Sequence, residues 1–350
     1  MNDFLIVKDL SCKINSSVIL DKLSFSIRNK GEIISFLGPS GVGKTTLIRC
    51  IAGLEKISSG EIVMNGSLYS TKKNSIEPEK RNMALSFQEN CLFPNKTVLE
   101  NIDIGFSRKK KPLKLTKNNL INLFKLSEIV SKYPHEISSG EIQRAQILRA
   151  LISNPDLLLL DEPFSNIDQD QREELQTNLK RVLKDNNIPT IIVTHDINEA
   201  FYMSDKCGVL IKNSIVQFDT PYNIHHYPNS KEVMQFISRG SLIKVKVLDK
   251  ETVFHEKLGK IKGNFITAPK IDSTVKLLIQ PEDITHDNTS KLKLKICDRK
   301  FRGTNFIYYL KLNTNEAIPV SVQSHNCEPC NINDELGIKL PIFINHLVFF

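Results

Sequence analysis

The stretch "GEIISFLGPSGVGKTTLIRCIAGL", residues 31–54, joins a β-branched run, a glycine-rich turn and apolar residues at helical spacing. A buried strand is predicted to end before Gly38 and a helix to start after Lys44, because the apolar pattern changes period between them. The turn fits G-x-x-x-x-G-K-[ST], whose backbone amides wrap the β- and γ-phosphates of a nucleotide while its lysine supplies a point charge and its threonine hydroxyl ligates Mg²⁺. The residues predicted to bind nucleotide are Gly38, Pro39, Ser40, Gly41, Val42, Gly43, Lys44, Thr45 and Thr46.

Polar residues also end three other predicted strands. "PDLLLLDE" ends in Asp161 and Glu162, "IPTIIVTHD" contains His195, and Gln88 follows the short apolar run in "ALSFQEN". We expect Asp161 to hold Mg²⁺ and Glu162 to orient or deprotonate an attacking water. A neutral His195 would hydrogen-bond the γ-phosphate or that water, and Gln88 would contact Mg²⁺ or the water. The predicted catalytic residues are Glu162, His195 and Gln88, and the predicted metal ligands are Thr45, Gln88 and Asp161.

Each of these assignments has a simpler alternative. An acidic helix cap would also explain Asp161 and Glu162, a lone histidine is more often structural, and Gln88 fits a solvated loop. The phosphate loop in the same chain favours the catalytic interpretation of these residues. A chance glycine turn is improbable there, because the loop follows a predicted strand and precedes a predicted helix.

A second helix opens with small polar residues, in "EISSGEIQRAQILRAL", residues 136–151. The free amides and the dipole at such a helix start form an anion site worth roughly half a positive charge. The residues at this start are Ser138, Ser139, Gly140 and Glu141. A chain with two predicted phosphate-binding sites would either bind two anions or associate with a second copy of itself.

The order of patterns predicts two domains. Buried strands alternating with helices predict an α/β domain over residues 1–237, a mostly parallel sheet preceded by antiparallel strands and carrying a helical subdomain. From about residue 243 to 350 the chain has short alternating segments and almost no helical spacing, which predicts a small closed β-barrel or sandwich. We assign it as an OB-like regulatory β domain.

Composition narrows the class of protein. No apolar run approaches the ~18 residues of a membrane span, and the N-terminus lacks a secretion pattern. The seven cysteines, an odd number, favour reduced thiols. The net charge of +8 could indicate a nucleic-acid partner, an anionic membrane surface, or a lysine-rich composition with no partner implied, and we favour the last. A cytosolic protein is predicted, unless a partner holds it at a membrane.

The order of the phosphate loop, Gln88, "ISSGEIQR", "LLLLDEP", "SNID" and "TH" resembles the nucleotide-binding subunit of ATP-binding cassette transporters across residues 1 to about 235. The resemblance implies ATP and Mg²⁺ as cofactors, and an ATPase coupled to transmembrane transport. It also implies a head-to-tail dimer, either a homodimer or a pair with another cassette subunit. The Ser138 helix start of one subunit would cap the ATP held by the phosphate loop of the other, and residues 165–168 would pass between subunits.

Within that family, "FQENCLFPNKTVLENI", "LDEPFSNID" and the β-rich tail resemble the importers. They look most like bacterial iron(III) importer ATPases, with polyamine and sugar importers close behind. This implies an integral-membrane permease as partner, a periplasmic or surface solute-binding protein indirectly, and a peripheral location on the cytoplasmic face of the cell membrane. A rival class is the soluble cassette ATPases that act on nucleic acid or ribosomes. Those usually carry two cassettes or a long coiled-coil insert, so no nucleic-acid partner is expected.

Four positions depart from the family pattern. Ser139 and Glu141 replace the usual Gly and Gln, and Glu141 would place a carboxylate near phosphates and weaken closure. No aromatic residue lies near Asn15, where adenine would stack, so discrimination among nucleotides should be loose. Gln280 stands where an arginine usually precedes Pro-Glu.

One motif lies outside the resemblance. "HNCEPC" offers His325, Cys327 and Cys330 as possible metal ligands, but no second pair completes a tetrahedral set. We favour a turn with coincidental cysteines.

Overall fold

The computed structural model describes residues 3–105, 113–238, 240–265, 269–325 and 328–350. Contacts between residues divide the chain into two compact units, Met1–Pro221 and Tyr222–Phe350. This division lies before the predicted one, since α7 (Pro221–His226) and α8 (Lys231–Ile237) fall largely in the second unit. The assignment of 1–237 and 243–350 as functional domains stays a prediction.

Contacts inside the second unit explain why these two helices group with it. Met234 of α8 packs in a small apolar cluster with Leu278 and Val348. The side chain of Gln280 is buried and its Nε2 donates a hydrogen bond of 2.9 Å to the backbone oxygen of His225 in α7. The departure from arginine at Gln280 therefore has a local structural role.

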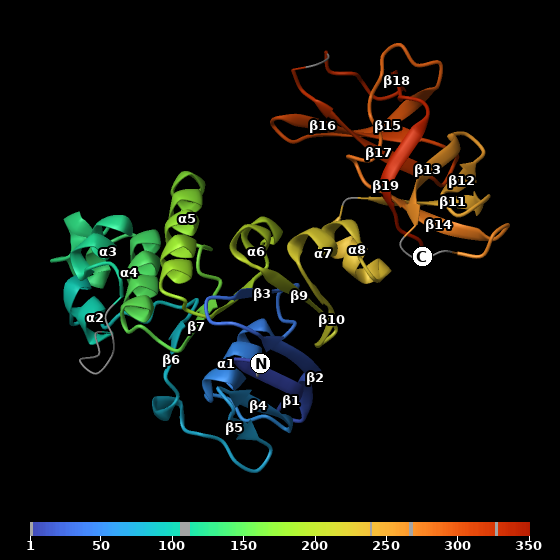
Figure 1. Cartoon of the computed structure of the whole chain (residues 1–350). Coiled ribbons are helices and arrows are strands. Elements are labelled where there is room, and N and C mark those ends of the chain that lie inside the picture. Colours follow the sequence, from blue (N-terminus) through green and yellow to red (C-terminus); the bar gives the residue numbers. More distant parts are fainter. Residues whose placement is uncertain (1–2, 106–112, 239, 266–268, 326–327) are drawn as a thin grey trace. The chain divides into compact units, whose positions relative to one another are not determined.

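The first unit is built on a six-stranded sheet with the order β10-β9-β3-β8-β7-β6 (Figure 1). All neighbouring strands are parallel except β10, which pairs antiparallel with β9. The predicted α/β fold is confirmed. The strands are β3 (Ile33–Leu37), β6 (Met83–Ser86), β7 (Leu157–Asp161), β8 (Thr190–Thr194), β9 (Lys206–Ile211) and β10 (Ser214–Asp219).

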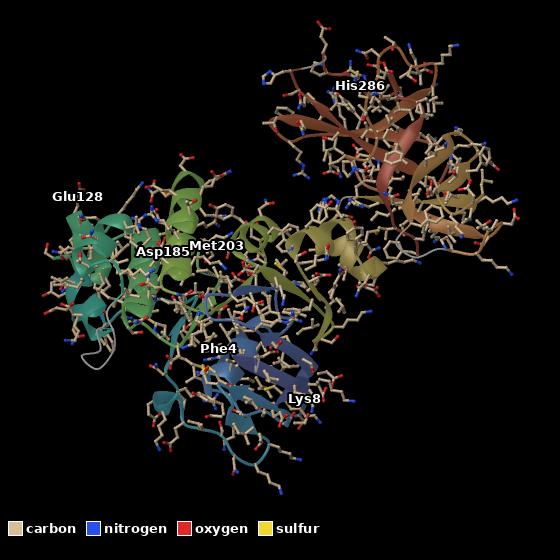
Figure 2. All side chains as sticks on the ribbon, in the orientation of Figure 1. Phe4, Lys8, Glu128, Asp185, Met203 and His286 are labelled. Carbon is tan, nitrogen blue, oxygen red and sulfur yellow. The ribbon has the colours of Figure 1, made fainter. Side chains whose placement is uncertain are left out.

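Alternate residues of the central strands enter two different cores, which is why these strands read as continuous apolar runs. Leu158 and Leu160 belong to a cluster with residues of α4 (Ser139–Ile152) and α5 (Gln169–Asp185), whereas Leu157 and Leu159 belong to a cluster with α1 (Lys44–Ala52). Met203, from α6 (Ile197–Met203), lies in the first cluster and Phe4 in the second (Figure 2).

An antiparallel sheet of order β2-β1-β4-β5 packs on the α1 side, and its first two strands are the predicted ones. Its bounds are β1 (Leu5–Ile14), β2 (Ser17–Ile27), β4 (Ser59–Met64) and β5 (Ser67–Thr71).

The helical subdomain contains α2 (Val98–Ile104), α3 (Lys117–Leu123) and α4, with short 3₁₀ turns at Pro78–Lys80, Ser127–Ile129 and Pro134–Glu136 in the same unit. The segment "NNLINLFKLSEIV", residues 118–130, has amphipathic helical spacing, but the structure does not form one continuous helix over it. The backbone of Lys125 has a φ of 54°, which a right-handed helix cannot contain, so α3 ends before it and a 3₁₀ turn follows.

The second unit holds two sheets, of order β14-β11-β12-β13-β19 and β17-β16-β15-β18. Residues of both sheets, such as Val245, Ile261, Tyr308 and Val320, share one apolar core, so the predicted small β domain is confirmed. The strands are β11 (Ser241–Val247), β12 (Thr252–His255), β13 (Gly259–Phe265), β14 (Thr274–Ile279), β15 (Lys293–Phe301), β16 (Asn305–Lys311), β17 (Ala317–Gln323), β18 (Glu335–Gly337) and β19 (Ile342–Leu347).

Candidate active site

The predicted phosphate loop lies between β3 and α1 and depends on its glycines. Gly43 caps α1 with a φ of 103°, a left-handed conformation that side chains other than glycine rarely adopt. A Cβ at Gly43 would lie 2.8 Å from the backbone oxygen of Ile19, and one at Gly38 would lie 2.6 Å from that of Leu210. Any larger residue would therefore push the loop away from its neighbours.

Lys44 lies folded over this loop. Its Nζ donates hydrogen bonds to the backbone oxygens of Gly38 and Pro39, at 2.9 and 3.0 Å, and only 6% of the residue is exposed. Burial lowers the pKa of Lys44, while the nearby carboxylates of Glu162 and Asp161 act to raise it. The ammonium group therefore lies within electrostatic range of both strand-end carboxylates.

Asp161 ends β7 and is 3% exposed. Burial raises the pKa of its carboxyl group, although a hydrogen bond with the Thr45 side chain and the charge of Lys44 oppose that rise. Among the described residues its Oδ1 has no hydrogen-bond partner. A buried, unpaired carboxylate oxygen beside a hydroxyl group matches the hard oxygen ligands that Mg²⁺ takes, so these residues fit a magnesium ion.

Glu162 brings the three predicted catalytic residues together. Gln88 Nε2 donates a hydrogen bond of 3.2 Å to Glu162 Oε2, and His195 Nδ1 lies 3.2 Å from Glu162 Oε1. The backbone of Glu162 has a φ of 45° and its amide donates to Val193 of β8 at 2.9 Å. Strained backbone of this kind clusters at functional sites, and here it accompanies a carboxylate that contacts both polar neighbours.

The second predicted anion site, at the start of α4, is closed by a capping box. Ser138 is the N-cap, and Glu141 Oε2 accepts hydrogen bonds of 2.8 Å from both the amide and the hydroxyl of Ser138. Partial desolvation raises the pKa of Glu141, but these bonds outweigh it and leave the pKa below its usual value. Glu141 therefore stabilises the helix start within this chain, and its predicted effect on closure stays a prediction.

Gly140, in the first turn of the same helix, approaches the loop of residues 165–168. A Cβ at Gly140 would lie 3.1 Å from the backbone oxygen of Asn166. Gly140 is therefore the position at which the helix start and this loop come close.

Two glutamines of α4 that the sequence motifs did not single out also contact the site, and each is 3% exposed. Gln143 Nε2 donates to the backbone oxygen of Glu162 at 2.8 Å, and its Oε1 accepts from the amide of Asn166 at 3.0 Å. Gln146 Nε2 donates to the backbone oxygen of Glu89 at 2.8 Å. One helix thus fixes the backbone at Glu162 and next to Gln88. Their signal in the sequence was the placement of amides at otherwise apolar, buried helical positions.

Asn15 lies in the tight turn between β1 and β2, where Asn15 and Ser16 have φ values of 47° and 67°. Two successive left-handed residues are typical of a hairpin turn that favours asparagine over aromatic residues. The missing aromatic at this position therefore has a conformational reason.

Of the three possible metal ligands in "HNCEPC", Cys327 lies outside the described residues. Among those that are described, no group of three or more His, Cys, Asp or Glu side chains is arranged to hold a metal ion. The interpretation as a turn stays a prediction.

We expect wild-type protein to bind ATP and GTP with comparable affinity and Asn15→Tyr to bind ATP more tightly. A ring stacked on a base contributes about 1–3 kcal/mol, while a left-handed tyrosine costs roughly 1–2 kcal/mol of fold stability. Nucleotide titrations followed by intrinsic fluorescence or calorimetry would measure both affinities, with Asn15→Ala as the control without a ring. A strong wild-type preference for ATP would show that another side chain stacks on the adenine.

A buried carboxyl group lies four residues after His195 in the sequence. Glu199, in α6, is 5% exposed, and burial raises its pKa to about 8 against the opposing hydrogen bond from Thr194. Of the charged neighbours, Asp196 and Glu162 raise this pKa further and Arg172 lowers it. The native protein therefore holds this proton at a pH where the unfolded chain has lost it.

Thermal stability should consequently fall as pH rises from about 5 to 9 in the wild type. Because the folded-state pKa of Glu199 is raised, its protonated form stabilises the folded protein fully below the unfolded-state pKa. This stabilisation is lost as the pH rises through the folded-state pKa, a change in the free energy of unfolding on the order of 4 kcal/mol. Glu199→Gln should show a smaller dependence. Melting curves across this range test the idea, and parallel curves for the two proteins would contradict it.

A phosphate loop, a buried aspartate and an adjacent glutamate at the ends of parallel strands define a P-loop nucleoside triphosphatase. The family model described as "ABC transporter" matches residues 20–165. The chain is 33% identical to the Fe(3+) ions import ATP-binding protein FbpC 2 of Haemophilus influenzae, over 83% of this chain and 81% of that protein. It is 31% identical to the spermidine/putrescine import ATP-binding protein PotA of Clostridioides difficile, over 95% and 94% of the two chains. The chain belongs to the ABC transporter family, as one of its ATPases.

Solved structures agree on the fold. A nucleotide-free ATP-binding cassette of an ABC transporter aligns with a TM-score of 0.57 and 22% identity, covering 67% of this chain and 98% of that one. A cassette in a post-hydrolysis state with ADP and phosphate aligns with a TM-score of 0.54 and 24% identity, covering 62% and 98%. Within the part of the chain that the structure describes, no helix has the length and apolar character to cross a membrane.

Proposed function

We propose that this chain is the subunit that hydrolyses ATP to drive solute import through a membrane permease. The observation that carries the proposal is the convergence of Gln88 and His195 on Glu162, directly after the buried Asp161. Three segments distant in the sequence thus supply a water-activating carboxylate with an adjacent metal ligand, and its two polar neighbours, in a chain that also has a phosphate loop.

Each residue has a role in hydrolysis. The phosphate-loop amides and Lys44 bind the β- and γ-phosphates, and Asp161, Thr45 and Gln88 would hold Mg²⁺, which neutralises phosphate charge when bound. Glu162 orients the attacking water and accepts its proton. His195 hydrogen-bonds the γ-phosphate or that water.

The helix start at Ser138 supports a dimer. The Glu141 carboxylate caps this helix start within one chain, and in two copies arranged head to tail the amides of the helix start would lie beside the nucleotide held by the phosphate loop of the other copy. The partner is a second copy of this chain or another cassette subunit. The second unit, Tyr222–Phe350, would adjust closure of this dimer without joining the chemistry.

The proposed solute is iron(III), and the proposed location is the cytoplasmic face of the cell membrane, bound to the permease. An iron(III) importer ATPase of Fusobacterium nucleatum is 31% identical over 91% of this chain, which supports iron. Polyamine is the second candidate, since the spermidine/putrescine relative covers 95% of the chain. The periplasmic or surface solute-binding protein would act indirectly, through the permease.

Uptake measurements separate the two solutes. Cells lacking the gene, with and without a plasmid copy, would be given radiolabelled iron(III) citrate or radiolabelled spermidine. Restoration of iron uptake alone supports the iron proposal, and restoration of spermidine uptake alone transfers it to polyamine. A plasmid carrying Glu162→Gln is the control for dependence on hydrolysis.

A further inference from the structure

Arg172 joins two segments of the active site that are distant in sequence. It lies in the first turn of α5, where its Nη2 donates a hydrogen bond of 3.1 Å to the backbone oxygen of Ile167. Its Nη1 lies 3.4 Å from Asp196 Oδ2. Ile167 belongs to the loop of residues 165–168, and Asp196 directly follows His195.

The Asp196 end of this bridge is fixed to the turn that carries His195. The amide of Asp196 donates to Thr194 Oγ1 at 3.0 Å. Its Oδ1 accepts from the amides of Asn198 and Glu199, at 2.9 and 3.3 Å, and so caps α6. A displacement of Asp196 would therefore be passed on to His195 through the backbone on either side of it.

The other end of the bridge is fixed to Glu162. Ser165 Oγ donates to the backbone oxygen of Glu162 at 3.1 Å, and the amide of Asn166 donates to Gln143, which also holds Glu162. Arg172 thus connects a loop tied to Glu162 with a turn tied to His195, the two side chains whose contact defines the site.

We propose that Arg172 is a positioning residue that couples the loop of residues 165–168 to the His195 turn and thereby keeps His195 in register with Glu162. This rests on the proposed role of His195 in ATP hydrolysis. The side chains of Arg172 and Asp196 are 30% and 33% exposed, so solvent screens their ion pair and it contributes little to folding. Its effect lies in geometry, because a misplacement of about 1 Å near reacting groups lowers a rate by up to about 10²-fold.

The test uses the full chain and steady-state ATP hydrolysis. Arg172→Met should lower kcat about 10-fold and change the KM for ATP less than about 2-fold, because the residue acts on His195 and not on the phosphate loop. Arg172→Lys keeps a donor and a charge, so it should recover part of kcat. Arg181→Met, an exposed arginine on the same helix, should behave as wild type.

Combining Arg172→Met with His195→Ala identifies the route of the effect. If Arg172 acts through His195, the second substitution should lower kcat little beyond His195→Ala alone. Full additivity, or a kcat for Arg172→Met equal to that of Arg181→Met, would overturn the coupling while leaving the proposed function intact. A wild-type rate for His195→Ala would overturn the role of His195 and the coupling with it. Should Arg172→Met lose its cooperative melting, the Arg172→Lys protein supplies the comparison, and unchanged kcat there together with lower melting temperature would assign a purely structural role.

Discussion

Glu162→Gln should lower the rate of ATP hydrolysis by about 10²–10³-fold and trap an ATP-bound dimer. Glutamine keeps the size of the side chain but cannot accept a proton from water, and loss of one group acting in the transition state typically costs this much in rate. The contact with Gln88, now 3.2 Å from Glu162 Oε2, can be kept by the new amide. Nucleotide binding should therefore survive while turnover fails.

Phosphate release and size-exclusion chromatography with ATP and Mg²⁺ measure the two effects. Glu128→Gln is the matched control, because Glu128 is exposed in a 3₁₀ turn of the helical subdomain (Figure 2). A Glu162→Gln protein that stays monomeric and hydrolyses ATP at the wild-type rate would refute the assignment of Glu162.

Lys44→Met should weaken ATP binding by about 10–100-fold. Hydrogen bonds from a charged group contribute about 1.5–3 kcal/mol, and the Lys44 ammonium now directed at the oxygens of Gly38 and Pro39 would bind phosphate oxygens instead. Methionine keeps the apolar stem that is buried in the loop. The fold should consequently remain intact.

Titration with a fluorescent ATP analogue gives the affinity, and circular dichroism melting checks the fold. Lys56→Met is the control, since Lys56 is exposed just after the same helix. An unchanged dissociation constant for Lys44→Met would show that the phosphates lie elsewhere.

Local sequence determined the elements that carry the chemistry. The β-branched run before Gly38 and the helical spacing after Lys44 located the phosphate loop, since both periods are set by backbone geometry within a few residues. The continuous apolar run before Asp161 likewise predicted a strand buried on both faces, and the structure has β7 there. The helix beginning after Ser138 was visible because capping is also local.

Tertiary structure alone decided which of these residues meet. Gln88, Glu162 and His195 come together because β6, β7 and β8 are neighbours in the sheet, and strand order depends on contacts between residues far apart in the chain. The bridge through Arg172 has the same origin, and so do the anchoring bonds of Gln143. The break in the helix at Lys125, with its left-handed backbone, was likewise not visible in the apolar spacing. The spacing of apolar residues indicates which face of a helix or strand is buried, but it does not indicate which other helix or strand packs against that face.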